Sequence, residues 1–207
     1  MHLIIEKVHK TSSDKLYSSA LFLYVQGAFD KVLHQWLAEI MTNNNFLPYL
    51  VEWVQSHLSD RAVRITDGAA SEPSFTPIQV GIPQGSLLSP FLFNVYSSLL
   101  CYNYQRLGME LMISYVDDYC LRAISVSWQR NTITLTAAGN QLQVEANQGR
   151  MNFDLSKTEL FHFPCSKTLL TADLLGVYFG EHQIANKLEQ SWVGVFFNKT
   201  LRATLHI

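Results

Sequence analysis

The sequence is poor in cysteine and has almost no net charge. Its 207 residues include three cysteines, Cys101, Cys120 and Cys165, which lie far apart and match neither a disulfide framework nor a metal-binding spacing. We therefore expect a reducing compartment inside the cell, the nucleus or the cytoplasm, and not secretion. The formal net charge of −2 lacks the basic excess typical of a complete nucleic-acid enzyme. Either the protein binds no nucleic acid, or its basic parts lie outside this sequence.

Long apolar runs and several catalytic motifs are also missing. The apolar stretch at the N-terminus is too short for a signal peptide. The run Ala20–Val25 has the length of a strand, far below the roughly 20 residues that span a bilayer. The seven His residues form no zinc-type cluster, and neither a Gly-x-Ser-x-Gly elbow nor a Walker-type phosphate loop is present. These absences argue against a membrane partner and against those three kinds of site.

Apolar residues make up 48% of the chain, which is enough for one substantial core. Strand-like runs alternate with segments in which apolar residues recur at helical spacing. This order predicts an α+β fold, an antiparallel sheet with helices packed on one face. Residues 127–148 are poorly patterned and predict a helix only in their later part. The other predicted helices span 1–15, 30–42 and 48–58 and resume at Pro90, and the predicted strands span 20–25, 62–66, 74–80, 111–114, 119–121, 160–163 and 192–197.

Two adjacent carboxylates form the most informative local pattern. Asp117 and Asp118 stand between the apolar run 111–114 and a second run at 119–121. The order predicts strand, acidic turn and strand, a hairpin with both carboxylates at its tip. Such a pair can hold magnesium ions that bridge a nucleoside triphosphate and a primer hydroxyl. Taken alone, the four residues Tyr115 to Asp118 are more typical of an ordinary solvated turn than of a metal site.

Two upstream segments favour the metal-binding interpretation. They are Gln26–Val32, which contains Phe29, and residues 81–94, which contain Pro83-Gln84-Gly85. In this order and spacing, they and the acidic hairpin resemble the palm motifs of reverse transcriptases from non-LTR (LINE-type) retrotransposons, of the kind found in fungal genomes. The resemblance covers about residues 16–207. It implies a polymerase palm with part of the fingers, and one domain fragment over 1–207 in which the start of the fingers and the thumb are missing.

The resemblance also implies a function. It is that of an RNA-directed DNA polymerase, which extends a DNA primer on an RNA template with dNTPs by two-metal chemistry with Mg²⁺, and it names no protein partner. Asp117 and Asp118 would bind the metal, and Lys157 would be a catalytic cation near the triphosphate. The other implied site residues are Phe29, Pro83, Gln84, Gly85 and Tyr115 for nucleotide and template, and Trp192 and Gly194 for gripping the primer.

One position departs from the family pattern. In that family the first metal-binding Asp stands five residues before an aromatic, and counting back from Phe29 gives Tyr24 instead. A neutral phenol is a poor ligand for magnesium, which prefers hard anionic oxygens. Asp30 lies six residues past Tyr24, after the strand has ended, and is poorly placed to substitute.

The functional hypotheses differ in how much catalytic activity they allow a chain with Tyr24 at this position. Metal-based charge stabilisation is worth several kcal/mol, and each ~1.4 kcal/mol is tenfold in rate, so we expect roughly a thousandfold loss of activity or more. The chain is then a polymerase by descent with little present activity. One alternative is an active polymerase that works with segments outside this sequence. Another is a non-catalytic retrotransposon remnant, either inert or weakly bound to nucleic acid.

Overall fold

The computed structural model describes residues 6, 8, 10–11, 14–64, 75–102, 109–163, 175–187, 189–192, 195–198 and 204–205. The chain forms two compact units. The first combines Met1–Gln26 with Leu99–Ile207, and the second is Gly27–Ser98. Among the described residues, no helix has the length and apolar character needed to cross a membrane.

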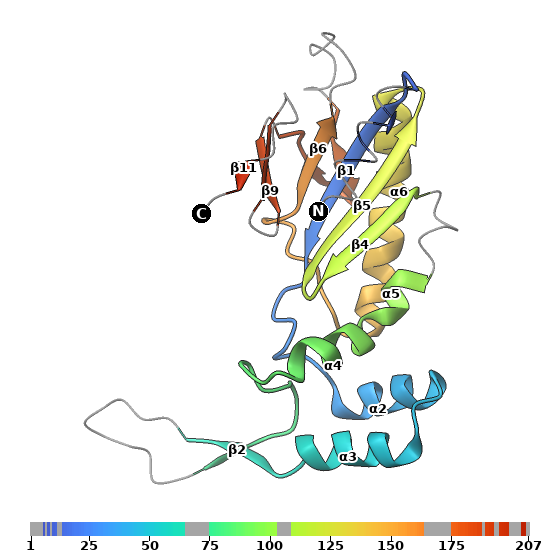
Figure 1. The fold of residues 1–207 in the computed structure, drawn as a ribbon. Coiled ribbons are helices and arrows are strands. Elements are labelled where there is room, and N and C mark those ends of the chain that lie inside the picture. The colour runs from blue at the N-terminus through green and yellow to red at the C-terminus, as the bar shows by residue number, and fades with distance from the viewer. Residues whose placement is uncertain are drawn as a thin grey trace, which may run out of the picture. The chain divides into compact units, whose positions relative to one another are not determined.

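A four-stranded antiparallel sheet is the centre of the first unit (Figure 1). Its strand order is β4-β5-β1-β6. The middle of β1 is buried on both faces, from Ser18 to Leu23, which is why its sequence reads as a continuous apolar run and not as an alternation. The strands span Tyr17–Tyr24 (β1), Leu111–Tyr115 (β4), Asp118–Ser125 (β5) and Glu159–Phe163 (β6).

One long helix, α6 (Trp128–Gln148), packs against β1 and β5 of this sheet (Figure 1). Ser127 caps its N-terminus, because the Ser127 hydroxyl accepts a hydrogen bond from the Arg130 amide at 3.2 Å. Leu135, Ala138 and Leu142 lie on its buried face. The sequence predicted only the later part of this helix, and that prediction was wrong about its start.

Buried polar residues explain the missed half of α6. Asn131 and Thr132 occupy buried positions near the N-terminus of the helix. Because both are polar, they interrupt the recurrence of apolar residues at helical spacing. The side-chain donors of both residues are satisfied within the fold. The Asn131 amide donates to the Tyr17 carbonyl at 3.0 Å and to the Ser19 hydroxyl at 3.1 Å, and the Thr132 hydroxyl donates to the Trp128 carbonyl at 2.9 Å. Because these bonds offset the cost of burying polar groups, the helix continues through them.

The opposite face of the sheet carries a second apolar cluster around a buried charge. Arg122 in β5 has no exposed surface. Its guanidinium donates to the Ser18 hydroxyl at 2.9 Å, to the Thr11 hydroxyl at 2.7 Å and to a Glu110 carboxylate oxygen at 2.8 Å. The ion pair and hydrogen bonds therefore compensate the burial of this cation. The surrounding apolar cluster comprises Val8, Ala20, Phe22, Cys120, Phe161 and Phe163.

The rest of the first unit is built from short antiparallel ribbons. β7 (Val177–Phe179) pairs with β8 (His182–Ile184), and the second ribbon has the order β11-β10-β9. Because Trp192 pairs with Val195, the continuous strand predicted over 192–197 is wrong: the chain reverses there. A glycine next to the reversal, Gly194, is typical of tight hairpins and atypical of strand interiors. The three strands span Glu189–Trp192, Val195–Asn198 and Thr204–Leu205.

The second unit is mainly helical. Its helix α2 begins at His34 and not at Asp30 as predicted, because the Asp30 and Lys31 amides both donate to the Gly27 carbonyl in a preceding turn. The predicted strand pair exists as the short β2 and β3, and residues 65–74 between them lie outside the described part. The elements are α2 (His34–Asn43), α3 (Pro48–Leu58), β2 (Arg61–Val63), β3 (Thr76–Ile78) and α4 (Ser89–Tyr96), followed by the short α5 (Ser98–Tyr102).

Candidate active site

The end of β1 and the tip of the β4–β5 hairpin lie side by side at one end of the sheet. Tyr24, the last residue of β1, pairs in register with Asp118, which also pairs with Tyr115 across the hairpin. The Val25 amide donates to the Asp117 carbonyl at 2.9 Å and fastens the turn to β1. The predicted hairpin is confirmed, with Asp117 in the turn and Asp118 opening β5. Sheet pairing therefore brings Tyr24 to both carboxylates.

The hairpin turn is strained. Val116 has φ +55°, the left-handed region that a β-branched side chain rarely adopts. A residue in such a conformation costs on the order of 1–3 kcal/mol and persists only where its surroundings impose it. Here the flanking register and the bond between the Asp117 carbonyl and β1 impose it. Strained turns of this kind cluster at functional sites, which supports a functional origin for the acidic tip.

Tyr24 is electrostatically coupled to the acidic tip. Its hydroxyl hydrogen-bonds the Asp117 carboxylate, and this bond is the main reason why the pKa of Tyr24 is raised. Partial burial and the charges of Asp117, Asp118 and Asp154 raise the pKa of Tyr24 further. The phenol therefore stays protonated and neutral at pH 7 and acts as a hydrogen-bond donor.

The pKa of Asp118 is raised by its surroundings. Burial is the main cause of the raised pKa of Asp118, and the neighbouring charge of Asp117 adds to it. The Lys157 ammonium acts in the opposite direction and lowers the pKa of Asp118. Burial and like-charge repulsion are the conditions in which a carboxylate gains from a nearby cation. The tip therefore attracts positive charge, and Lys157 is one source of it.

The turn before β6 supplies that cation together with a third acid. Lys157 Nζ lies 4.2 Å from the centre of the Tyr24 ring and 3.9 Å from an Asp154 carboxylate oxygen. The Asp154 amide donates to the Tyr24 carbonyl at 2.8 Å and attaches the turn to the end of β1. The Asp154 carboxylate accepts hydrogen bonds from Ser156, which lowers the pKa of Asp154. Sequence reasoning missed Asp154 as a site residue, although it stands three positions before Lys157.

The second unit holds another group of predicted residues. The Ile82 amide donates to the Phe29 carbonyl at 2.8 Å, and the Gln84 amide donates to the Asp30 carboxylate at 2.9 Å. The structure thus brings Phe29 next to the loop that contains Pro83, Gln84 and Gly85. The Phe29 ring packs edge-on against Phe93 at 5.8 Å. Gly85 has φ +88° and open space around it, so its backbone is accessible.

The remaining predicted site residues lie at the edges of the described structure. Tyr115 ends β4 and is 61% exposed. Trp192 ends β9, where only its backbone is described, and Gly194 lies outside the described residues. Their predicted roles in nucleotide and primer binding stay predictions.

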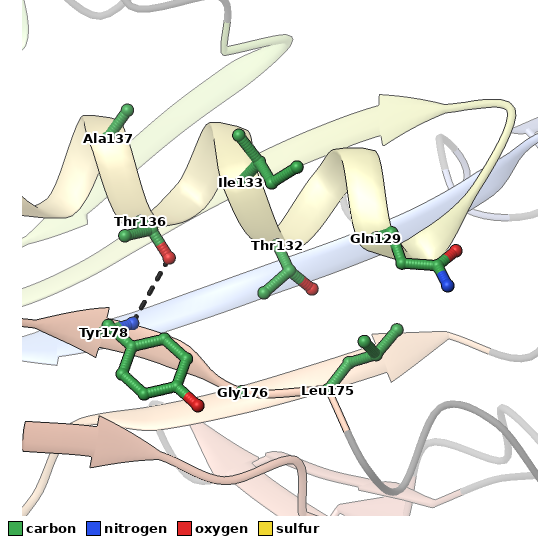
Figure 2. Close-up of a pocket in the computed structure, with 8 residues that line it drawn as sticks. All are labelled: Gln129, Thr132, Ile133, Thr136, Ala137, Leu175, Gly176 and Tyr178. Carbon is green, nitrogen blue, oxygen red and sulfur yellow. Dashed lines mark hydrogen bonds between the residues drawn. The ribbon is translucent and has the colours of Figure 1, made fainter.

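A separate apolar groove of about 500 Å³ runs along α6 in the first unit (Figure 2). The Tyr178 amide donates to the Thr136 hydroxyl at 3.2 Å and ties β7 to the helix. None of the residues predicted for the site lines this groove, so its chemistry is separate from that of the acidic tip. The lining residues are Gln129, Thr132, Ile133, Thr136, Ala137, Leu175, Gly176 and Tyr178.

Comparison with solved structures defines the class of fold. The chain is similar over its full length to apo telomerase of Candida tropicalis truncated from its C-terminal domain, with a TM-score of 0.63, 14% identity and coverage of 40% of that chain. It is similar to the telomerase of Candida tropicalis in complex with the TWJ fragment of telomeric RNA, with a TM-score of 0.64, 12% identity and coverage of 99% of this chain and 33% of that chain. At these identities the likeness concerns the fold alone, that of a polymerase palm and fingers.

The sequence itself identifies the family. Residues 1–195 match the family described as reverse transcriptase (RNA-dependent DNA polymerase), and the chain belongs to it. It is 24% identical to the RNA-directed DNA polymerase from mobile element jockey of Drosophila funebris over the whole chain and 22% of that relative. It is 32% identical to the probable RNA-directed DNA polymerase from transposon BS of Drosophila melanogaster over 58% of the chain and 14% of that relative. The predicted kinship with non-LTR retrotransposon polymerases is confirmed, and the fungal affinity stays a prediction.

Membership in this family implies dependence on divalent metal ions in general. The side chains gathered at the acidic tip are the carboxylates of Asp117 and Asp118 and the phenol of Tyr24. Magnesium prefers near-octahedral oxygen ligands, preferably anionic, whereas Tyr24 offers a neutral phenol that acts as a hydrogen-bond donor toward Asp117. Among the described residues, no group of three or more His, Cys, Asp and Glu side chains is arranged to hold a metal ion. Asp154, the third acid near Tyr24, is thus not grouped with Asp117 and Asp118 in a metal-binding arrangement.

Proposed function

We propose that this chain is a reverse transcriptase palm by descent that catalyses little or no nucleotide addition. The observation that carries the proposal is the position of Tyr24, which ends β1 in register with Asp118 and hydrogen-bonds Asp117. In the family pattern this position belongs to the first metal-binding Asp. The chain spans at most 22% of the length of the curated relatives described above, so the activity of a whole polymerase is itself a proposal for it.

The chemistry supports a large loss of activity. Transfer of a nucleotide to a primer depends mainly on positioning and on neutralising the charge of the phosphates. A site in which a neutral phenol replaces an anionic metal ligand loses much of the transition-state stabilisation that the metal ions supply, which is worth several kcal/mol. Asp30 is a poor substitute, because it lies six residues past Tyr24, after β1 has ended, and its carboxylate accepts the hydrogen bond of Gln84.

Primer extension tests the proposal directly. We expect the purified chain, given a DNA primer on an RNA template with dNTPs and either Mg²⁺ or Mn²⁺, to produce no more product than its own Asp117→Ala variant. The reason is that neither protein then holds a complete carboxylate set. A complete reverse transcriptase assayed in parallel controls for the substrates. Robust synthesis by the unaltered chain that disappears in Asp117→Ala would contradict the proposal and favour an active polymerase.

A second candidate function is weak binding to nucleic acid without catalysis. The telomerase of the same fold was solved with a fragment of telomeric RNA, which supports nucleic acid as the class of partner here. With a formal net charge of −2, the chain offers few cations for phosphate contacts. We expect weak association with an RNA–DNA primer–template duplex, which fluorescence anisotropy measures over a salt series. If the logarithm of the binding constant falls linearly with the logarithm of the salt concentration, the protein contacts phosphates. If no binding is detected at low salt, the chain is an inert remnant.

A further inference from the structure

The Lys157 ammonium contacts Tyr24, the residue that ends β1 beside the acidic tip. It lies over the face of the Tyr24 ring, with 4.2 Å between Nζ and the ring centre. A second contact, 3.9 Å to an Asp154 carboxylate oxygen, directs it to the same place. The ring and the lysine come from segments more than a hundred residues apart, and backbone hydrogen bonding between Asp154 and Tyr24 joins these segments.

The ring is the element that makes this position specific. The face of an aromatic ring carries partial negative charge and attracts an ammonium, whereas a carboxylate or an aliphatic side chain at position 24 offers no such face. Three acids surround the ring closely enough to influence its hydroxyl, namely Asp117, Asp118 and Asp154. Lys157 also influences Asp118 directly. The acidic tip and its nearest cation are thus connected through Tyr24.

We propose that Tyr24 is a positioning residue that holds the Lys157 ammonium as a built-in counter-cation of the acidic tip. The substitution at position 24 then has two consequences: it removes a metal ligand and it provides a binding place for an internal cation. In this position Lys157 competes with divalent cations for the carboxylates. This inference rests on the proposed function, but the contacts it is drawn from and the measurements that test it do not require polymerase activity.

The size of the effect follows from the exposure of the contact. The Lys157 side chain is 59% exposed, so the interaction is that of a surface cation–π pair. Such a pair changes the population of the contact by about two- to fivefold. Lysine acylation is sensitive to a change of this size, because an amine that rests on a ring and beside a carboxylate is less available to a reagent than a free one.

Two variants of Tyr24 separate the ring from the hydroxyl. Tyr24→Phe keeps the ring and removes the hydroxyl, whereas Tyr24→Leu removes both. Lysine acylation with a small activated ester, measured for each site by mass spectrometry, should give unchanged modification of Lys157 in Tyr24→Phe and about two- to fivefold faster modification in Tyr24→Leu. Lys187, which pairs with Glu159 elsewhere in the first unit, serves as the internal control and should not change.

A second measurement keeps the proposal testable if a Tyr24 variant fails to fold. Mn²⁺ binding, followed by electron paramagnetic resonance, should be tighter in Lys157→Gln than in the unaltered chain, because the internal competitor for the carboxylates is gone. Equal Mn²⁺ affinity in the two proteins, or equal acylation of Lys157 in the Phe and Leu variants, would overturn the proposal. Primer extension by the unaltered chain would overturn the proposed function instead and leaves both of these readouts intact.

Discussion

Restoring an acid at position 24 should produce the largest functional change in this chain. We expect Tyr24→Asp to extend a DNA primer on an RNA template at least about a hundredfold faster than the unaltered chain. Stabilisation of the transition state by metal ions could alone account for up to roughly a thousandfold. The new carboxylate would end β1 in register with Asp118 and next to Asp117, where the phenol now lies. The variant also removes the ring on which Lys157 rests. Steady-state primer extension with Mg²⁺ measures the effect.

The matched control for this prediction is Tyr24→Asn. Asn has nearly the shape of Asp and also removes the ring, but it adds no anionic ligand, so we expect activity at the level of the unaltered chain. Mn²⁺ binding should be tighter in Tyr24→Asp than in Tyr24→Asn, since both variants lose the ring that holds Lys157 but only Asp adds an anionic ligand. If Asp and Asn behave alike in both assays, the charge at position 24 is not what the site lacks. Tighter metal binding without primer extension would place the remaining deficit outside the acidic tip.

Removing the buried cation Arg122 should produce the largest loss of stability. We expect Arg122→Met to lower the free energy of unfolding by about 3 kcal/mol, because it breaks a largely buried ion pair and its hydrogen bonds. The Met side chain replaces much of the apolar stem but leaves Ser18 and Thr11, both almost fully buried, without the guanidinium as donor. Glu110, which is 31% exposed at its side chain, is relieved in part by water. Urea denaturation followed by circular dichroism measures the change.

An exposed arginine on α6 provides the comparison for Arg122. Arg130→Met removes the same charge from the surface of the first unit and should change the free energy of unfolding by no more than about 0.5 kcal/mol. Adding Glu110→Gln to Arg122→Met should recover part of the loss, since it removes the negative charge that Arg122 no longer balances. A loss in Arg122→Met no larger than that in Arg130→Met would show that the buried network contributes little to stability.

Local sequence patterns predicted the fold correctly where apolar side chains are buried and polar side chains are exposed. The acidic hairpin was predicted correctly because apolar runs flank a polar turn, and its pairing follows from that order alone. The start of α6 was missed because Asn131 and Thr132 are polar residues with core positions. The segment 192–197 was read as one strand because its apolar run conceals a reversal beside Gly194. In both cases a long-range or hairpin contact, invisible in the local pattern, decided the outcome.

By itself, the sequence determined the family, the acidic pair and the substitution at Tyr24, because these depend on which residues stand in which order. Only the tertiary structure decided where Lys157 lies and how Arg122 is compensated. Lys157 is 133 positions from Tyr24, and Arg122 is 111 positions from Thr11, so no local periodicity relates them. Strand pairing and the turn before β6 bring these partners together. The phenol at position 24 is thus a property of the sequence, whereas the ammonium that lies over its ring is a property of the fold.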